Sequence, residues 1–325
     1  MIGFAESIEG ALANGKPSIL FGNGFSRAWN NEIFSYENLL KAADFGGRGN
    51  DLKRIFERLG TFDFEAVMRS LEAAQLVLEV YGDGDALVRK IVGDQDVLKQ
   101  ALIDVISKTH PDRPNAVQDD EYRAARTFCS QFFNVFTLNY DLLLHWLRNK
   151  GDLVPRVDYE TDDGFRRTDW RGFGTNQKIY FLHGALHLFD EGGIKKHASK
   201  NSGVAIIDSV RRNLDEGKFP IFVSEPSAEK KKKRIEHNPY LNFCYSALRD
   251  QKGDFFVHGH SFDLNDKHVF DQLKKSDVKN YFVGLFGDED SEGNQKIKGH
   301  AMAWLVKRGT SVRFYDAATA AIWKK

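Results

Sequence analysis

Short apolar runs recur along the chain, and each run ends in small or polar residues. The runs lie at 18–21, 134–138, 178–182, 219–223, 254–257, 281–285 and 311–315. Helical spacing of apolar residues separates several of them and predicts helices at 141–148, 238–249 and 301–307. Continuous apolar strands separated by helices are typical of a parallel sheet that is buried on both faces. The pattern therefore predicts an α/β fold, a Rossmann-like parallel sheet with helices on both faces.

A long stretch after the first strand has a different character. No proline occurs between Pro17 and Pro111. Apolar residues repeat with helical spacing within it, over 64–78 and 97–106. We predict that residues 36–131 form an inserted helical module and that the sheet domain is made of residues 1–35 and 132–325.

Three further segments are predicted from local composition. A short helix is expected at 5–15, before the first strand. The segments 152–177 and 190–218 are polar and contain glycine. Such segments commonly carry function on the surface, so we expect them to form flaps or loops near the site.

Composition narrows the possible functions. The 325 residues hold 46 Lys and Arg against 46 Asp and Glu, so no overall positive charge indicates nucleic-acid binding. No apolar run is long enough to cross a bilayer, and the first residues lack the features of a signal peptide. Cys129 and Cys244 are too few for a disulfide framework or a four-cysteine zinc site. We therefore expect a cytoplasmic protein with no membrane segment and no bound metal.

The end of the first strand carries the turn Gly22-Asn23-Gly24-Phe25-Ser26. Ligands of open α/β sheets bind beyond the carboxyl ends of the strands, and glycines before a helix let backbone N–H groups approach a phosphate. Ser26 is a plausible N-cap of that helix. Arg27 stands where the dinucleotide-binding fingerprint has its third glycine, and no P-loop motif is present, which disfavours a dehydrogenase or an NTPase. A glycine turn without any ligand is the alternative.

Two more strand ends carry side chains suited to chemistry. Thr137-Leu138-Asn139-Tyr140-Asp141 places an amide and a carboxylate two positions apart, and strand alternation would put them on one side. The alternative is that Asp141 caps the next helix and Asn139 makes a turn. His183 ends another run and can act as a general base, or can simply bond to a backbone group.

A later strand ends in His258-Gly259-His260-Ser261, followed by two acids. Ser261 is suited to hydrogen bonding with a ribose or a phosphate. Asp263 and Asp266 are expected either to contact a ligand or to cap the next helix. The charge run at 229–234, Glu-Lys-Lys-Lys-Lys-Arg, is expected to be a solvated helix face, with contact to a phosphate or a partner as the less favoured interpretation.

Taken in order, these motifs resemble those of the sirtuin-like NAD-binding superfamily. The correspondence comprises Gly22 to Ser26, Thr137 to Asp141, His183-Gly184 and Gly259-His260-Ser261. A tyrosine between Asn139 and Asp141 is typical of bacterial sirtuin-like proteins from anti-phage defence systems. The two Cys-x-x-Cys pairs of the sirtuin zinc module are missing here, which argues against a protein deacylase. Superfamily members that lack this module often look like NAD⁺ hydrolases.

The resemblance implies an enzyme that cleaves NAD⁺ to ADP-ribose and nicotinamide, as an effector of defence by NAD⁺ depletion. Asn139 would orient the water or the ribose, Asp141 would hold the nicotinamide-side geometry or orient Asn139, and His183 would accept a proton. The pyrophosphate would lie on Gly22, Gly24 and Ser26, and Arg27 would contact phosphate or nicotinamide. The adenosine half would contact Gly259 and Ser261. The remaining residues expected to bind NAD⁺ are Asn23, Phe25, Thr137 and His260.

A second hypothesis is a protein that binds NAD⁺ or an ADP-ribose-type nucleotide without turnover and regulates a partner. Release of nicotinamide separates the two hypotheses. Because unregulated NAD⁺ hydrolysis would harm the cell that makes the enzyme, the first hypothesis also implies an activating protein partner or a homo-oligomer.

Overall fold

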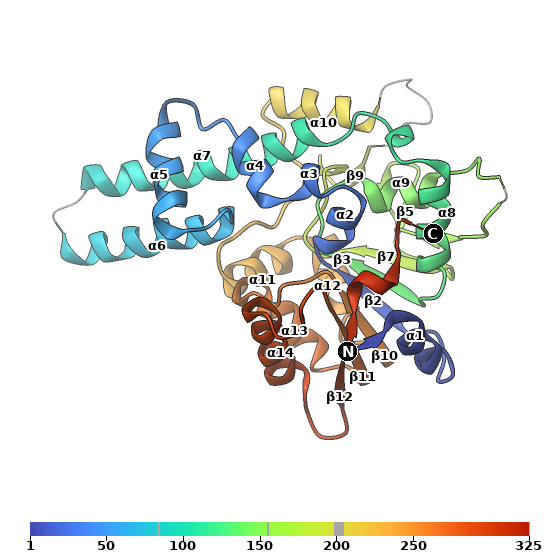
Figure 1. The fold of residues 1–325 in the computed structure, drawn as a ribbon. Helices are drawn as coiled ribbons and strands as arrows, with labels where there is room; N and C mark the ends of the chain where they lie inside the picture. Colours follow the sequence, from blue (N-terminus) through green and yellow to red (C-terminus); the bar gives the residue numbers. More distant parts are fainter. Residues whose placement is uncertain (83–84, 155, 198–204, 325) are drawn as a thin grey trace.

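The computed structural model describes residues 1–82, 85–154, 156–197 and 205–324 (Figure 1). Its main sheet has the strand order β1-β12-β11-β10-β2-β3-β7-β4, and neighbouring strands run parallel throughout. This confirms the predicted α/β, Rossmann-like fold. The strands are β1 (Ile2–Gly3), β2 (Ser18–Phe21), β3 (Asn134–Thr137), β4 (Thr161–Asp162), β7 (Gln177–Phe181), β10 (Lys252–His258), β11 (Asp277–Leu285) and β12 (Ser311–Asp316).

Helices cover both faces of this sheet. On one face, Phe4 of α1 (Phe4–Leu12) stacks on Phe128 of α8 (Asp119–Cys129), with ring centroids 4.8 Å apart, and also contacts Phe256 of β10. Phe255 precedes Phe256 on β10 and points to the opposite face, because side chains alternate along a strand. It contacts Phe136 on that face. That face carries a row of helices that contact one another: α12 (Pro239–Ser246), α13 (Lys267–Leu273) and α14 (Glu292–Leu305).

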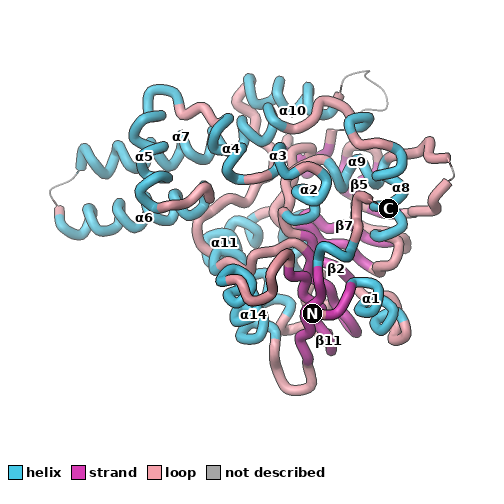
Figure 2. Tube along the Cα trace, viewed as in Figure 1, coloured by secondary structure: helices cyan, strands magenta, loops and turns pink. Residues whose placement is uncertain are grey.

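The connection from β2 to β3 is helical, as the periodicity predicts. It begins with α2 (Gly24–Trp29), α3 (Asn31–Phe34), α4 (Tyr36–Ala42) and α5 (Gly49–Leu59). The two apolar stripes fall in α6 (Phe64–Tyr81) and α7 (Asp85–Thr109), which pack together and extend away from the sheet (Figures 1 and 2). The last helix of the connection, α8, instead packs on the sheet.

One predicted strand is wrong. The run at 219–223 does not join the sheet, and its pairing within the described residues is a single antiparallel bridge from Phe222 to Gly184. The segment lies across the residues that follow β7, where the Ala185 N–H donates to the Ile221 carbonyl. Ile221, Phe222 and Val223 are buried there, and Phe222 stacks on Tyr140 with ring centroids 3.7 Å apart. The run is apolar because it is buried over the end of the sheet, and this made it look like a strand in the sequence.

The segments 152–177 and 190–218 were expected to form flaps or loops near the site, and their described residues include short strands and a helix. They contribute to a small antiparallel sheet of β5 (Phe165–Arg166), β6 (Asp169–Trp170), β9 (Ile194–Lys196) and β8 (Leu188–Asp190), and to α10 (Ile206–Asp215). Residues 155 and 198–204 lie outside the described residues. Trp170 packs on Tyr240 and Phe243 of α12. The described residues of both segments are absent from the lining of the cavity described below.

None of the helices in the described parts of the chain is both long and apolar enough to pass through a membrane.

Candidate functional site

A cavity of about 940 Å³ lies at the carboxyl ends of the parallel strands. Its volume falls within the range of about 300–1,000 Å³ that is common for ligand and cofactor sites. Residues that follow β2, β3, β7, β10, β11 and β12 line it, together with parts of α4, α6 and α7. The lining includes these residues of the sequence analysis: Gly22, Asn23, Gly24, Arg27, Asn139, Asp141, His183, Gly259, His260 and Ser261.

Three residues that were expected to bind ligand lie behind the cavity wall instead. Phe25 is 1% exposed and packs against Phe21, with ring centroids 4.4 Å apart, so it belongs to the core. Thr137 is buried, and its hydroxyl accepts a hydrogen bond from the Asn139 N–H at 3.0 Å. Ser26 is fully buried between two site residues, as described below. These three residues therefore support the cavity wall from behind and do not line the cavity.

The glycines of the first turn serve the contact between two strand ends. The Gly22 N–H donates to the His258 carbonyl and the Gly24 N–H to the Gly259 carbonyl, each at 2.9 Å. A Cβ on Gly22 would lie 2.6 Å from the Gly259 oxygen, and a Cβ on Gly259 would lie 2.5 Å from the Gly24 Cα. Gly259 also has a φ of +68°, which glycine adopts without strain. The N–H groups of Gly22 and Gly24 were expected to hold a phosphate, but both are already hydrogen-bonded to backbone carbonyls.

Ser26 links the two expected catalytic residues of the second strand end. Its hydroxyl donates to Asp141 Oδ2 at 2.5 Å and accepts from Asn139 Nδ2 at 2.9 Å. It is not an N-cap, since α2 begins at Gly24. Asp141 Oδ1 accepts from the Leu143 N–H at 2.9 Å, where α9 (Leu143–Asn149) begins. Asp141 therefore holds Asn139 through Ser26 and also binds the first N–H of α9, whose N-cap residue is Leu142.

Burial sets the protonation of both titratable groups here. Burial raises the pKa of Asp141, and the hydrogen bonds from Ser26 and the Leu143 N–H partly offset this. His183 is 2% exposed, and its Nε2 lies 3.2 Å from Nε2 of His268. Burial lowers the pKa of His183 well below its ordinary value, and the nearby charge of Lys231 lowers it further. His183 is thus held neutral near pH 7.

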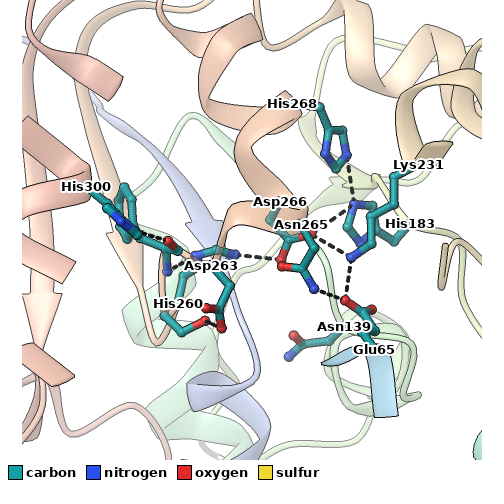
Figure 3. A network of polar contacts seen from close by, with 12 residues as sticks. Glu65, Asn139, His183, Lys231, His260, Asp263, Asn265, Asp266, His268 and His300 are labelled. Carbon is teal, nitrogen blue, oxygen red and sulfur yellow. Dashed lines mark hydrogen bonds and ion pairs between the residues drawn. The ribbon is translucent and has the colours of Figure 1, made fainter. Parts of the chain in front are cut away.

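A polar network that the sequence did not reveal surrounds His183 (Figure 3). Its centre is Lys231 of α11 (Ala228–His237), which is 1% exposed. Lys231 Nζ lies 2.8 Å from Glu65 Oε2 on α6 and 2.8 Å from Asp266 Oδ1. Asp266 Oδ1 lies in turn 3.9 Å from His183 Nε2. The inserted helices and the sheet domain therefore meet in one charged cluster at the cavity.

The charge run at 229–234 was predicted to be a solvated helix face, but Lys231 within it is buried. Its neighbours on the charge run form surface ion pairs, Lys230 with Glu72 and Lys233 with Glu229. Lys231 lies one helical turn before the buried Ile235, and this spacing was the one signal in the sequence for its burial.

Asp266 accepts one further hydrogen bond in this cluster, from His260. His260 Nδ1 accepts from the Phe262 N–H at 2.8 Å, so its Nε2 donates to Asp266 Oδ2 at 3.1 Å. Burial alone would raise the pKa of Asp266, but the charge of Lys231 and the His260 hydrogen bond outweigh it and hold that pKa well below its ordinary value. Neither Asp263 nor Asp266 caps a helix through its side chain, so the capping alternative is wrong. Asp263 instead accepts from Ser261 and Lys296.

Comparison with known proteins gives a family. The chain matches no curated protein. The sequence model of a domain of unknown function, DUF4917, matches residues 19–323. The match spans nearly all of the chain, including every strand end that lines the cavity. The chain therefore belongs to the DUF4917 family.

Proposed function

We propose that the protein hydrolyses NAD⁺ to ADP-ribose and nicotinamide. The observation that carries the proposal is the convergence of two groups on one cavity of dinucleotide size. One is Asn139, held by Ser26 and Asp141, and the other is a buried, neutral His183. The order of the motifs, which resembles that of sirtuin-like proteins, gives the substrate.

The reaction breaks the bond between the nicotinamide nitrogen and ribose C1′. The bonding electron pair leaves with nicotinamide, which becomes neutral, and positive charge develops on the ribose. Water then bonds to C1′ and loses a proton, which His183 accepts. Asn139 donates its amide N–H to Ser26, so its carbonyl oxygen is left to orient the water or a ribose hydroxyl.

The pyrophosphate is proposed to lie near the cavity rim. Because the N–H groups of Gly22 and Gly24 are bonded, side-chain cations are the better donors to a phosphate. Arg27 and Lys324 line the cavity and are exposed. We propose Arg27 as the main phosphate contact, with Ser261 on the adenosine side.

We further propose that the enzyme acts in the cytoplasm as an effector of anti-phage defence. Such an effector must stay inactive until it is needed, so we propose control by an activating protein partner or by assembly of several copies.

The test measures NAD⁺ consumption and nicotinamide release by chromatography, with and without candidate partners. Wild type is expected to release nicotinamide, whereas Asn139→Ala and His183→Ala abolish release and keep the wild-type circular dichroism spectrum. His237→Ala, at an exposed histidine on α11, is the control and keeps full activity. Tight NAD⁺ binding without release would favour the nucleotide-sensor hypothesis. No consumption under any of these conditions would refute the hydrolase.

A further inference from the structure

Glu65 brings a carboxylate from the inserted helices into the cavity (Figure 3). It is the second residue of α6, and its side chain is 13% exposed. Glu65 Oε2 accepts from Lys231 at 2.8 Å and also from Asn265. Within the described residues, no hydrogen bond reaches Glu65 Oε1. One oxygen is thus held in place and the other is left for a ligand.

The charges around Glu65 leave an excess of negative charge. Lys231 stands between Glu65 and Asp266 and pairs with both. His183 and His268 beside them have lowered pKa values and add no positive charge near pH 7. When both carboxylates are ionised, the three groups carry one net negative charge at the cavity wall. Such a wall favours a ligand that carries a positive charge.

We propose that the Glu65 carboxylate faces the nicotinamide-ribose half of NAD⁺ and stabilises its positive charge. This inference rests on the proposed function. The positive charge lies on the nicotinamide ring in bound NAD⁺ and moves to the ribose as the C1′–N bond breaks. The Glu65 carboxylate would attract the charge in both states without forming a covalent bond. The inserted helices then supply a catalytic residue, so the site is complete only when α6 lies against α11.

The ionisation of Glu65 gives a pH signature. Burial raises the pKa of Glu65 to about 7, with the charges of Asp266 and Asp63 adding to the rise and that of Lys231 opposing it. The other titratable groups that line the cavity near this cluster include Tyr36 on α4, Asp63 before α6, His183 after β7, and His260 and Asp263 after β10. Arg69 of α6 is a further cation close to Asp63. Because the ionised form is the active one, kcat is expected to rise with pH through this region.

The experiment compares Glu65→Gln with Glu72→Gln. Both changes remove one acidic charge from α6, but Glu72 pairs with Lys230 outside the cavity lining. Glu65→Gln is expected to lower kcat about 100-fold, the usual cost of losing one electrostatic group at a transition state, and to flatten the pH profile near neutrality. Glu72→Gln is expected to keep both. Binding of ADP-ribose, measured by calorimetry, shows that the cavity of each variant is intact.

A second measurement separates this inference from the proposed function. NADH has the shape of NAD⁺ without the ring charge and does not release nicotinamide, so binding of the two compares charge alone. Glu65→Gln is expected to reduce the preference for NAD⁺ over NADH about tenfold, and Glu72→Gln to preserve it. If wild type turns over NAD⁺ but Glu65→Gln keeps its kcat and pH profile, the role of Glu65 is refuted. If wild type releases no nicotinamide, the proposed hydrolase activity is refuted. The role of Glu65 is refuted separately if Glu65→Gln keeps the wild-type preference for NAD⁺ over NADH, or if wild type binds neither nucleotide.

Discussion

Replacing Ser26 with alanine tests the link between the two strand ends. Ser26 is fully buried, and its hydroxyl joins Asp141 to Asn139. Ser26→Ala removes one oxygen and changes the packing little. It leaves the Asp141 carboxylate with the Leu143 N–H as its remaining bond among those described, and it frees the Asn139 amide.

The structure sets the size of the effect. The bond to a carboxylate is worth about 1.5–3 kcal/mol and the bond from the Asn139 amide about 0.5–1.5 kcal/mol. Since Asn139 lines the cavity, water can replace the second bond, so most of the loss comes from Asp141. We expect Ser26→Ala to lower the free energy of unfolding by about 2–3 kcal/mol. The loss shrinks in acid, because a protonated Asp141 gains less from the Ser26 donor.

Ser18→Ala is the matched control for this change. Ser18 is also buried, at the other end of β2, and donates to the neutral Gln251 side chain at 2.7 Å. Its loss should cost about 1 kcal/mol and leave nicotinamide release unchanged. Urea unfolding followed by tryptophan fluorescence, together with the release assay, compares the two. The reasoning is refuted if Ser26→Ala is no less stable than Ser18→Ala, or if it keeps wild-type release.

Three further predictions concern stability and are checked by urea unfolding. Gly24→Ala places a Cβ against the Gly259 backbone and should cost about 1–3 kcal/mol or more. Gly10→Ala in α1, where an added Cβ would meet no atom within 4 Å beyond its own stretch of helix, should stabilise by about 0.5 kcal/mol; equal effects would contradict the close approach. Lys231→Met leaves two largely buried carboxylates without their cation and should cost about 3–5 kcal/mol, against about 0–1 kcal/mol for Lys230→Met; similar losses would argue against the charged triad. Stability should fall as the pH drops from about 6.5 toward 4, by about 2 kcal/mol per histidine at pH 5, because the unfolded chain binds protons that three buried histidines with pKa values of about 4 exclude. The three histidines are His110, His258 and His268. A free energy of unfolding that does not change over that pH range would show that their rings are not held neutral.

The sheet was predictable because its central strands β2 and β3 are buried on both faces. The run at 18–21 coincides with β2, and the helical stripes fall in α6 and α7. The run at 219–223 misled for the same reason, because Phe222 is buried over a sheet end with the same apolar signature as a strand. The two-residue strands β1 and β4 are too short to leave any pattern.

The candidate site was predictable in position but not in detail. Strand ends place Asn139 and His183 at the cavity without further information. Which backbone groups are free depends on tertiary contacts, so the pairing of the Gly22 N–H with the His258 carbonyl could not be foreseen. Glu65 and Lys231 come from elements far apart in sequence and look like ordinary helix-surface residues. Only the packing of α6 against α11 makes them a buried pair.

The most direct test of the central claim is the stoichiometry of products formed from NAD⁺ by the purified protein, with its partner present where one is required. We predict equal amounts of nicotinamide and ADP-ribose from wild type, and neither from Asn139→Ala under the same conditions. Intact NAD⁺ after prolonged incubation with wild type, or equal release by Asn139→Ala, would contradict the account.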